Sequence, residues 1–136
     1  MKNKKGFTLA ELLAVIVILG IIAALATPAI MSIYRRNQER LYCTKISILE
    51  ADAVTWGERN LDSLPVIEEG QAPNNITPNL TVERLVQDRI TSPDDEETGF
   101  VLDPRTNEPI NEYRIRVYLR WDKIYAQIID VDPEAC

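Results

Sequence analysis

The sequence predicts an α+β fold in which one long N-terminal α-helix packs on a small antiparallel β-sheet. Three patterns support this prediction. Residues 7–33 are almost entirely apolar, residues 42–56 carry apolar side chains at helical spacing, and residues 113–121 alternate between apolar and mostly basic side chains. A chain of 136 residues has room for one compact domain and an appendage, so we expect a single head attached to the helix.

Charge and composition exclude several classes of function. The formal net charge is -6, and the carboxylates concentrate after residue 37. An acidic body repels phosphate backbones at long range, which argues against bulk binding of nucleic acid. The chain has no histidine, and it contains no nucleophile motif, phosphate-binding glycine loop or metal-ligand spacing. We therefore expect no catalytic residues, no metal and no cofactor, and an enzyme is the least favoured class.

The apolar segment is long enough to cross a membrane. Counted from Phe7 to Ile33 at about 1.5 Å per residue, a helix spans a hydrocarbon core of roughly 30 Å. The preceding residues 1–5 carry three lysines, and positive charge holds that end in the cytoplasm, so the rest of the chain is expected outside. Pro28 lacks an amide N–H and crowds the preceding turn, so we expect a kink or a local loosening there.

One carboxylate, Glu11, lies inside this apolar segment. A charged side chain near the centre of a bilayer helix costs about 3 kcal/mol even on lenient insertion scales. Such a group usually pairs with a cation or becomes protonated. Glu11 is therefore expected to have a partner.

The residues around Glu11 carry a resemblance to a known family. After the short basic leader the sequence reads Gly6-Phe7-Thr8-Leu9-Ala10-Glu11-Leu12, and an apolar helix containing Pro28 follows. This arrangement closely resembles the N-terminus of type IV pilins and type II secretion pseudopilins. The resemblance ends near Arg35 and does not cover the head.

The resemblance implies a processing site and an assembly contact. A prepilin peptidase would cut between Gly6 and Phe7, and Phe7 would be N-methylated at its new terminus. Glu11 would then neutralise the Phe7 amine of a neighbouring subunit, and Pro28 would belong to the assembly helix. The implied partners are related pilin subunits, the peptidase, an inner-membrane assembly platform with its ATPase, and membrane lipid before assembly. The head would face the outside and end in an extracytoplasmic filament.

This interpretation divides the chain into four parts: a leader (1–6), a membrane or filament-core helix (7–34), an amphipathic half of the same helix (35–60) and a head (61–136). We expect one helix from about Phe7 to Arg59, because apolar residues form one stripe on its second half. The members of this stripe are Tyr42, Ile46, Leu49, Ala53 and Trp56. The stripe is expected to dock the head.

The head is expected to contain a connector, a short helix and a β-hairpin. In the connector, Leu64, Val66 and Ile67 are expected to tuck against the long helix, and Thr81 is expected to cap a short helix ending at Gln87. Phe100–Leu102 suggests a brief strand. In the clearest strand, apolar residues alternate with mostly basic ones. A turn at Asp122-Lys123 is expected to lead into a second strand, Ile124–Val131. The apolar face of the first strand comprises Tyr113, Ile115, Val117, Leu119 and Trp121.

The two cysteines, Cys43 and Cys136, are expected to pair. Outside the cytoplasm a disulfide is favoured over a metal site, because two thiols without any histidine leave a zinc shell half empty. Such a bridge would fasten the C-terminus to the long helix. It departs from many Gram-negative pilins, whose disulfide joins two cysteines near the C-terminus.

Four alternatives stay open. Ala24-Leu25-Ala26 is compatible with an ordinary signal-peptide cleavage site, which would release a soluble binding protein that begins at Thr27. The second alternative is a single-span membrane protein whose head binds a partner without polymerising. The third is a nucleic-acid contact made by Arg114, Arg116 and Arg120 with Tyr118. The fourth is calcium binding by the acidic run Asp94–Glu97, although a solvated loop is favoured. Nothing in the sequence selects among adhesion, motility, DNA uptake or competence, and secretion.

Overall fold

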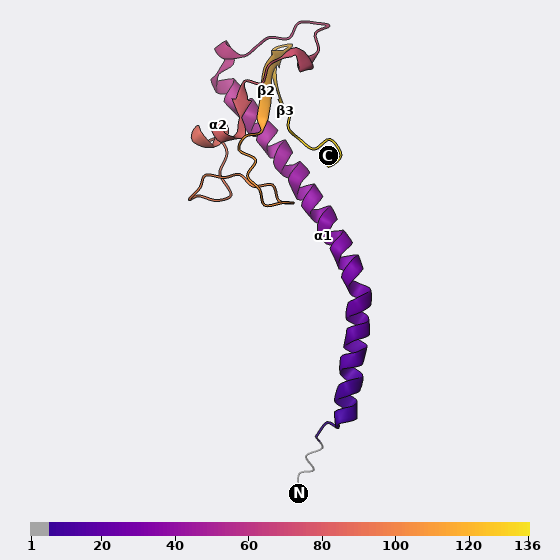
Figure 1. Ribbon diagram of the computed structural model, residues 1–136. Coiled ribbons are helices and arrows are strands. Elements are labelled where there is room, and N and C mark those ends of the chain that lie inside the picture. Colours follow the sequence, from indigo (N-terminus) through magenta and orange to yellow (C-terminus); the bar gives the residue numbers. More distant parts are fainter. Residues whose placement is uncertain (1–5) are drawn as a thin grey trace. The chain divides into compact units, whose positions relative to one another are not determined.

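A computed structural model describes residues 6–136, and it confirms the predicted α+β architecture. The predicted lysine-bearing leader segment, residues 1–5, lies outside the described residues. The dominant element is α1 (Leu9–Arg59), a single helix of 51 residues (Figure 1). It ends where the sequence predicts and begins at Leu9 instead of Phe7.

The chain forms two compact units, which divide between Asn37 and Gln38. In the described part of the first unit every residue is exposed except the half-buried Ala26. This part of α1 is long and apolar enough to cross a membrane, and none of its most apolar stretch is buried. The helix continues without interruption through Pro28.

The second unit, the head, contains the sheet (Figure 1). Its elements are η1 (Leu61–Ser63), η2 (Pro73–Asn75), β1 (Leu80–Thr81), α2 (Val82–Gln87), β2 (Arg114–Arg120) and β3 (Lys123–Ile128). The strands lie in the order β1-β2-β3, and both pairings are antiparallel. Thr81 caps α2 as predicted, because its hydroxyl accepts a hydrogen bond from the Arg84 amide at 3.3 Å.

The core of the head lies between α1 and the sheet. Tyr42, Ile46, Leu49 and Ala53 of the predicted stripe are buried, and Trp56 is half-buried. Across the sheet, Ile115 pairs with Ile128, Val117 with Ala126 and Leu119 with Ile124, so the predicted apolar face continues from β2 onto β3. The second half of α1 therefore docks the head, as the apolar spacing predicts.

Gly57 allows this close packing. A Cβ atom added there would lie 2.9 Å from both Ile124 Cγ2 and Val117 Cγ1, closer than carbon atoms pack. Gly57 is buried and directly follows the half-buried Trp56 of the stripe. The absence of a side chain at this point lets α1 approach the sheet.

The hairpin differs from the prediction at its turn. Trp121 and Asp122 form the two-residue loop, and both have positive φ, 52° and 56°. The turn is therefore not Asp122-Lys123, and Trp121 is 68% exposed instead of lying on the core face. The register, in which Arg120 pairs with Lys123, leaves Trp121 and Asp122 as the loop, and positive φ at both positions is the type I′ geometry that follows the right-handed twist of the strands.

Three smaller expectations were also wrong. The second strand ends at Ile128 and not at Val131. Phe100 and Leu102 make only isolated bridges, to Asp95 and Pro109, instead of a strand. In the connector Leu64 and Ile67 are buried as expected, but Val66 is 64% exposed. Val66 points away from its buried neighbour Ile67, because successive residues of an extended segment point to opposite sides.

Gly57→Ala is expected to destabilise the head. Overpacking typically costs about 1–3 kcal/mol, which exceeds the roughly 1 kcal/mol that alanine gains over glycine in a helix. Urea unfolding of the head, followed by tryptophan fluorescence, measures the change. Gly20→Ala is the matched control, since a Cβ there meets no atom within 4 Å. An unchanged midpoint for Gly57→Ala would contradict the close packing.

Candidate functional site

The predicted processing segment lies at the exposed start of the described chain. Gly6 and Phe7 precede α1, and Phe7 is 89% exposed. A Cβ added to Gly6 would meet no atom within 4 Å, and Gly6 is not among the residues with positive φ. The fold itself therefore does not require glycine at this position, so any requirement must come from a partner that reads the segment.

Glu11 takes part in a capping box with Thr8. The Thr8 amide donates to Glu11 Oε2 at 3.0 Å, and the Glu11 amide donates to Thr8 Oγ1 at 3.3 Å. Each side chain thus satisfies an amide at the start of α1 that has no partner within the helix. The negative carboxylate also lies at the positive end of the helix dipole.

The capping box was not predicted, although Thr8 and Glu11 carry its sequence signal. A threonine followed three residues later by a glutamate, at the start of an apolar run, is the pattern that predicts one. Glu11 therefore has a partner within its own chain. Its predicted contact with the Phe7 amine of a neighbouring subunit involves a second chain and stays a prediction.

Pro28 lies within α1 and removes one amide donor from it. The side chain of Thr27 donates to the Ala23 carbonyl at 2.6 Å, and Ser32 donates to the Ala29 carbonyl at 2.9 Å. Side-chain hydrogen bonds to helix carbonyls of this kind often accompany local bending. The helix nevertheless remains continuous across this segment.

A second cluster fastens the C-terminus to α1; we call it the C-terminal clamp. It consists of Tyr42, Cys43, Asp103, Arg105, Asp132 and Cys136. The disulfide Cys43–Cys136 is present as expected, with Cα atoms 5.6 Å apart, and it links positions 93 residues apart. The sequence predicted the pairing of the cysteines and the place of Tyr42 in the apolar stripe, but not the roles of Asp103, Arg105 and Asp132.

The Arg105 guanidinium is the centre of the clamp. It lies 3.6 Å from the centroid of the Tyr42 ring, donates to Asp103 Oδ2 at 2.8 Å and donates to Asp132 Oδ2 at 3.0 Å. The Tyr42 hydroxyl accepts a hydrogen bond from the Asp132 amide at 3.3 Å. One cation thus links α1, the loop around residue 104 and the C-terminal segment.

This arrangement shifts the pKa values of the clamp. Burial raises the pKa of Asp103, which is 4% exposed, but hydrogen bonds and charge from Arg105 outweigh burial and leave that pKa below its ordinary value. The Asp132 pKa is lowered by a hydrogen bond from the Glu134 amide and by Arg105. The Arg105 pKa is raised further, chiefly by Asp103. The clamp is therefore an ionised network at neutral pH.

The arginine row of β2 is engaged within the head. Arg114 binds Asp130 at 2.6 Å, Arg116 donates to the Ile76 carbonyl at 2.8 Å, and the Arg120 guanidinium lies 4.3 Å from the Trp121 ring centroid. Tyr118 is buried and stacks on Tyr125. These contacts occupy the groups that a nucleic acid would need, so they weaken that alternative.

The acidic run Asp94–Glu97 is tied to neighbouring segments. Asp94 binds Lys45 at 2.6 Å and accepts a hydrogen bond from the Leu102 amide, whereas Asp95 accepts from Thr98 and from the Glu97 amide. Within residues 6–136 no group of three or more histidine, cysteine, aspartate or glutamate side chains is placed to hold a metal ion.

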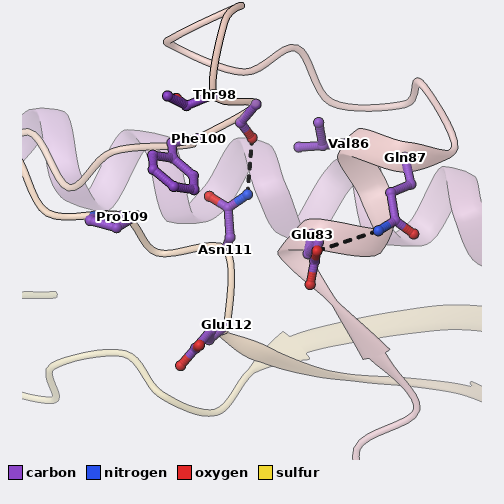
Figure 2. A pocket seen from close by; sticks show the side chains of 9 residues that line it. Glu83, Val86, Gln87, Thr98, Phe100, Pro109, Asn111 and Glu112 are labelled. Atoms are coloured by element: carbon purple, nitrogen blue, oxygen red, sulfur yellow. Dashed lines mark hydrogen bonds between the residues drawn. The ribbon is translucent and has the colours of Figure 1, made fainter.

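The head also has a surface pocket of ≈ 540 Å³ between α2 and the segment 98–112 (Figure 2). Phe100 and Pro109 line one side, and Glu83, Val86 and Gln87 of α2 line the other. Asn111 lies between them and donates to the Gly99 carbonyl at 3.0 Å. The lining contains no histidine, cysteine or cation, and its charged residues are Glu83 and Glu112.

The head is expected to lose stability below about pH 4, because the folded pKa values of Asp103 and Asp132 lie under the unfolded value. Carboxylates with a lowered pKa stabilise the fold above the unfolded pKa, and this contribution disappears as the pH falls through the folded pKa. Urea titrations from pH 7 to pH 2 measure the effect.

Asp103→Asn is expected to cost about 2 kcal/mol at pH 7, since it leaves Arg105 without its closest anion, and to flatten the acid dependence. The exposed Asp62→Asn is the matched control. An acid profile identical in the two variants would rule out the clamp as its source.

Comparison with known families identifies only the N-terminal segment. The model of the prokaryotic N-terminal methylation motif matches residues 1–27, which include Gly6, Phe7 and Glu11 and end one position before Pro28. No curated protein and no solved structure matches the chain significantly. The match confirms the resemblance drawn from Gly6–Leu12, since this motif is the prepilin signature of type IV pilins and pseudopilins.

Proposed function

We propose that this chain, which carries the prepilin signature, is a structural subunit of a type IV pilus-like or pseudopilus filament. The observation that supports the proposal most directly is the methylation motif at residues 1–27, joined to a pilin-like architecture. A long apolar helix with a small α+β head suits a subunit whose helix first lies in a membrane and then packs against the helices of other subunits in the filament.

Processing begins at the exposed peptide bond between Gly6 and Phe7. A prepilin peptidase cleaves this bond and releases the leader, and the new Phe7 amine is N-methylated. Because Gly6 and Phe7 are exposed and precede α1, an enzyme reaches the bond without unwinding the helix. The fold makes no demand for glycine at position 6, which is consistent with recognition by the peptidase.

Assembly uses the apolar half of α1. Exposure of its apolar side chains to water is unfavourable, whereas contact with lipid or with other apolar helices is favourable. Transfer from the membrane into a filament core therefore keeps these side chains away from water. Glu11 neutralises the Phe7 amine of a neighbouring subunit, which lowers the cost of burying either charge. The capping box keeps the Glu11 carboxylate at the helix N-terminus, close in sequence to the amine formed at Phe7.

The partners of this process are related subunits, the prepilin peptidase, and an inner-membrane platform with its ATPase. The N-terminus starts in the cytoplasm and the head lies outside, where the Cys43–Cys136 disulfide persists under oxidising conditions. The role of the chain is structural, and no residue of the described part is assigned to catalysis. A single-span binding protein that does not polymerise is the second candidate function. It is supported by the head, which forms a compact unit of its own.

The mature protein is expected to begin at Phe7. N-terminal sequencing of protein from a producing bacterium tests this, and Gly6→Val is expected to leave the leader attached because the added side chain obstructs the peptidase. Gly20→Val controls for a general effect of the substitution. A mature N-terminus at Thr27 would instead establish the signal-peptide alternative and end this proposal.

Three substitutions separate the two roles of Glu11. Glu11→Gln keeps the hydrogen bond that the Glu11 side chain accepts from the Thr8 amide but removes the charge, and Glu11→Ala removes both. Thr8→Ala keeps the charge and removes only the hydrogen bond from the Glu11 amide to Thr8 Oγ1. Filaments are expected to fall sharply for both Glu11 variants and to persist for Thr8→Ala, while the head remains folded and exported. Filament yield in sheared fractions is the measurement. Wild-type yields with Glu11→Gln would show that charge neutralisation is not needed.

A further inference from the structure

The tip of the β2–β3 hairpin carries an unusual residue. Trp121 adopts a φ of 52° in the turn and is 68% exposed. The left-handed conformation costs about 1–2 kcal/mol for a residue with a bulky side chain, and Asn-Gly is the favoured pair in this turn. Neither the turn nor the core calls for tryptophan here. A bulky, exposed tryptophan at a position where the turn favours asparagine or glycine points to a role in contact with a partner.

The neighbours of Trp121 extend this surface. The Arg120 guanidinium lies over the Trp121 ring, and Arg120 forms no ion pair within residues 6–136. Its Nε is buried without a hydrogen-bond acceptor. Val66, 64% exposed, pairs with Leu119 beside the end of β2. We call Val66, Arg120 and Trp121 the hairpin tip; it combines exposed apolar area with a guanidinium that has no ion-pair partner among the described residues, and tryptophan and arginine are typical of interface hot spots.

The pocket beside α2 has the complementary composition. Its wall includes the 41%-exposed Phe100 ring with Val86 and Pro109, and Glu83 and Glu112 also line it; the Glu83 carboxylate accepts a hydrogen bond from the Gln87 side-chain amide (Figure 2). Within the described residues neither carboxylate forms an ion pair. An aromatic wall with two uncompensated carboxylates suits a cation held against an aromatic ring.

The hairpin tip and this pocket lie at opposite ends of β2. Glu112 comes just before the strand, and Trp121 follows its last residue, Arg120. Seven residues of strand at about 3.3 Å each separate the two by roughly 20 Å. A head therefore cannot fill its own pocket with its own tip, but two copies arranged head to tail can.

We propose that the hairpin tip of one copy docks into the Glu83–Phe100–Glu112 pocket of the next copy. Trp121 packs against Phe100, and Arg120 binds the carboxylates of Glu83 and Glu112. Because donor and acceptor surfaces differ, the contact is heterologous, and repetition yields an open chain of heads. This inference rests on the proposed filament function. The docked hairpin tip supplies the contact between heads, and the apolar helices supply the contact in the filament core.

The test is cross-linking between two full-length chains in membranes and detergent extracts. One chain carries Lys123→Cys beside the tip, the other carries Thr98→Cys at the pocket, and a short bismaleimide joins them. Both native cysteines are already paired, so the introduced thiols are the only ones available. Gln127→Cys replaces Lys123→Cys in the control, because it is exposed on the same strand but away from the tip.

Heterodimer yield for Lys123→Cys is expected to exceed that of the control at least about fivefold, and Trp121→Asn is expected to abolish the excess. Asparagine favours positive φ, so this variant should keep or raise the unfolding temperature, which separates lost contact from lost folding. Arg120→Glu should reduce the yield, and Glu112→Arg on the other chain should restore it. Equal yields for Lys123→Cys and Gln127→Cys, or an unchanged yield with Trp121→Asn, overturn the proposal.

Filament yield distinguishes this inference from the proposed function. Normal filaments together with equal cross-linking yields for Lys123→Cys and Gln127→Cys reject the docking contact and leave the filament role intact. A cross-link that forms in membranes of cells that make no filament rejects the filament role and supports the contact between heads.

Discussion

The head depends on one narrow face of α1 packed against β2 and β3. Tyr42, Leu49 and Ala53 are buried on this face, and Gly57 removes the side chain that would otherwise hold the helix away from the sheet. A sheet of three strands needs a second layer that covers its apolar face. The second half of α1 is that layer, so this helix belongs to the N-terminal unit and also to the core of the head.

The C-terminal clamp complements this packing with polar and covalent links. The Arg105 guanidinium connects Tyr42 of α1 to Asp103 and Asp132, and the disulfide ties Cys136 to the adjacent Cys43. A small head buries a limited apolar area, and disulfides in secreted domains commonly compensate for that. The clamp thus holds the last segment of the chain where apolar contacts alone would be few.

The two halves of α1 have different surroundings. Near Leu9 the helix exposes apolar side chains and needs lipid or other helices, and its capping box fixes where it starts. Beyond Gln38 the same helix is amphipathic and folds with the head. One continuous helix thus contains an exposed apolar part and a part that packs in the head, and the hairpin tip and the pocket both lie on the head.

The sequence alone determined the long helix, its apolar stripe, the N-terminal methylation motif and the pairing of Cys43 with Cys136. These features follow from local periodicity, a contiguous motif and a count of two cysteines. Tertiary structure alone decided the turn at Trp121, the Arg105 clamp and the close approach at Gly57. Each depends on residues distant in sequence, or on strand register, and neither residue type nor spacing encodes which side chains meet.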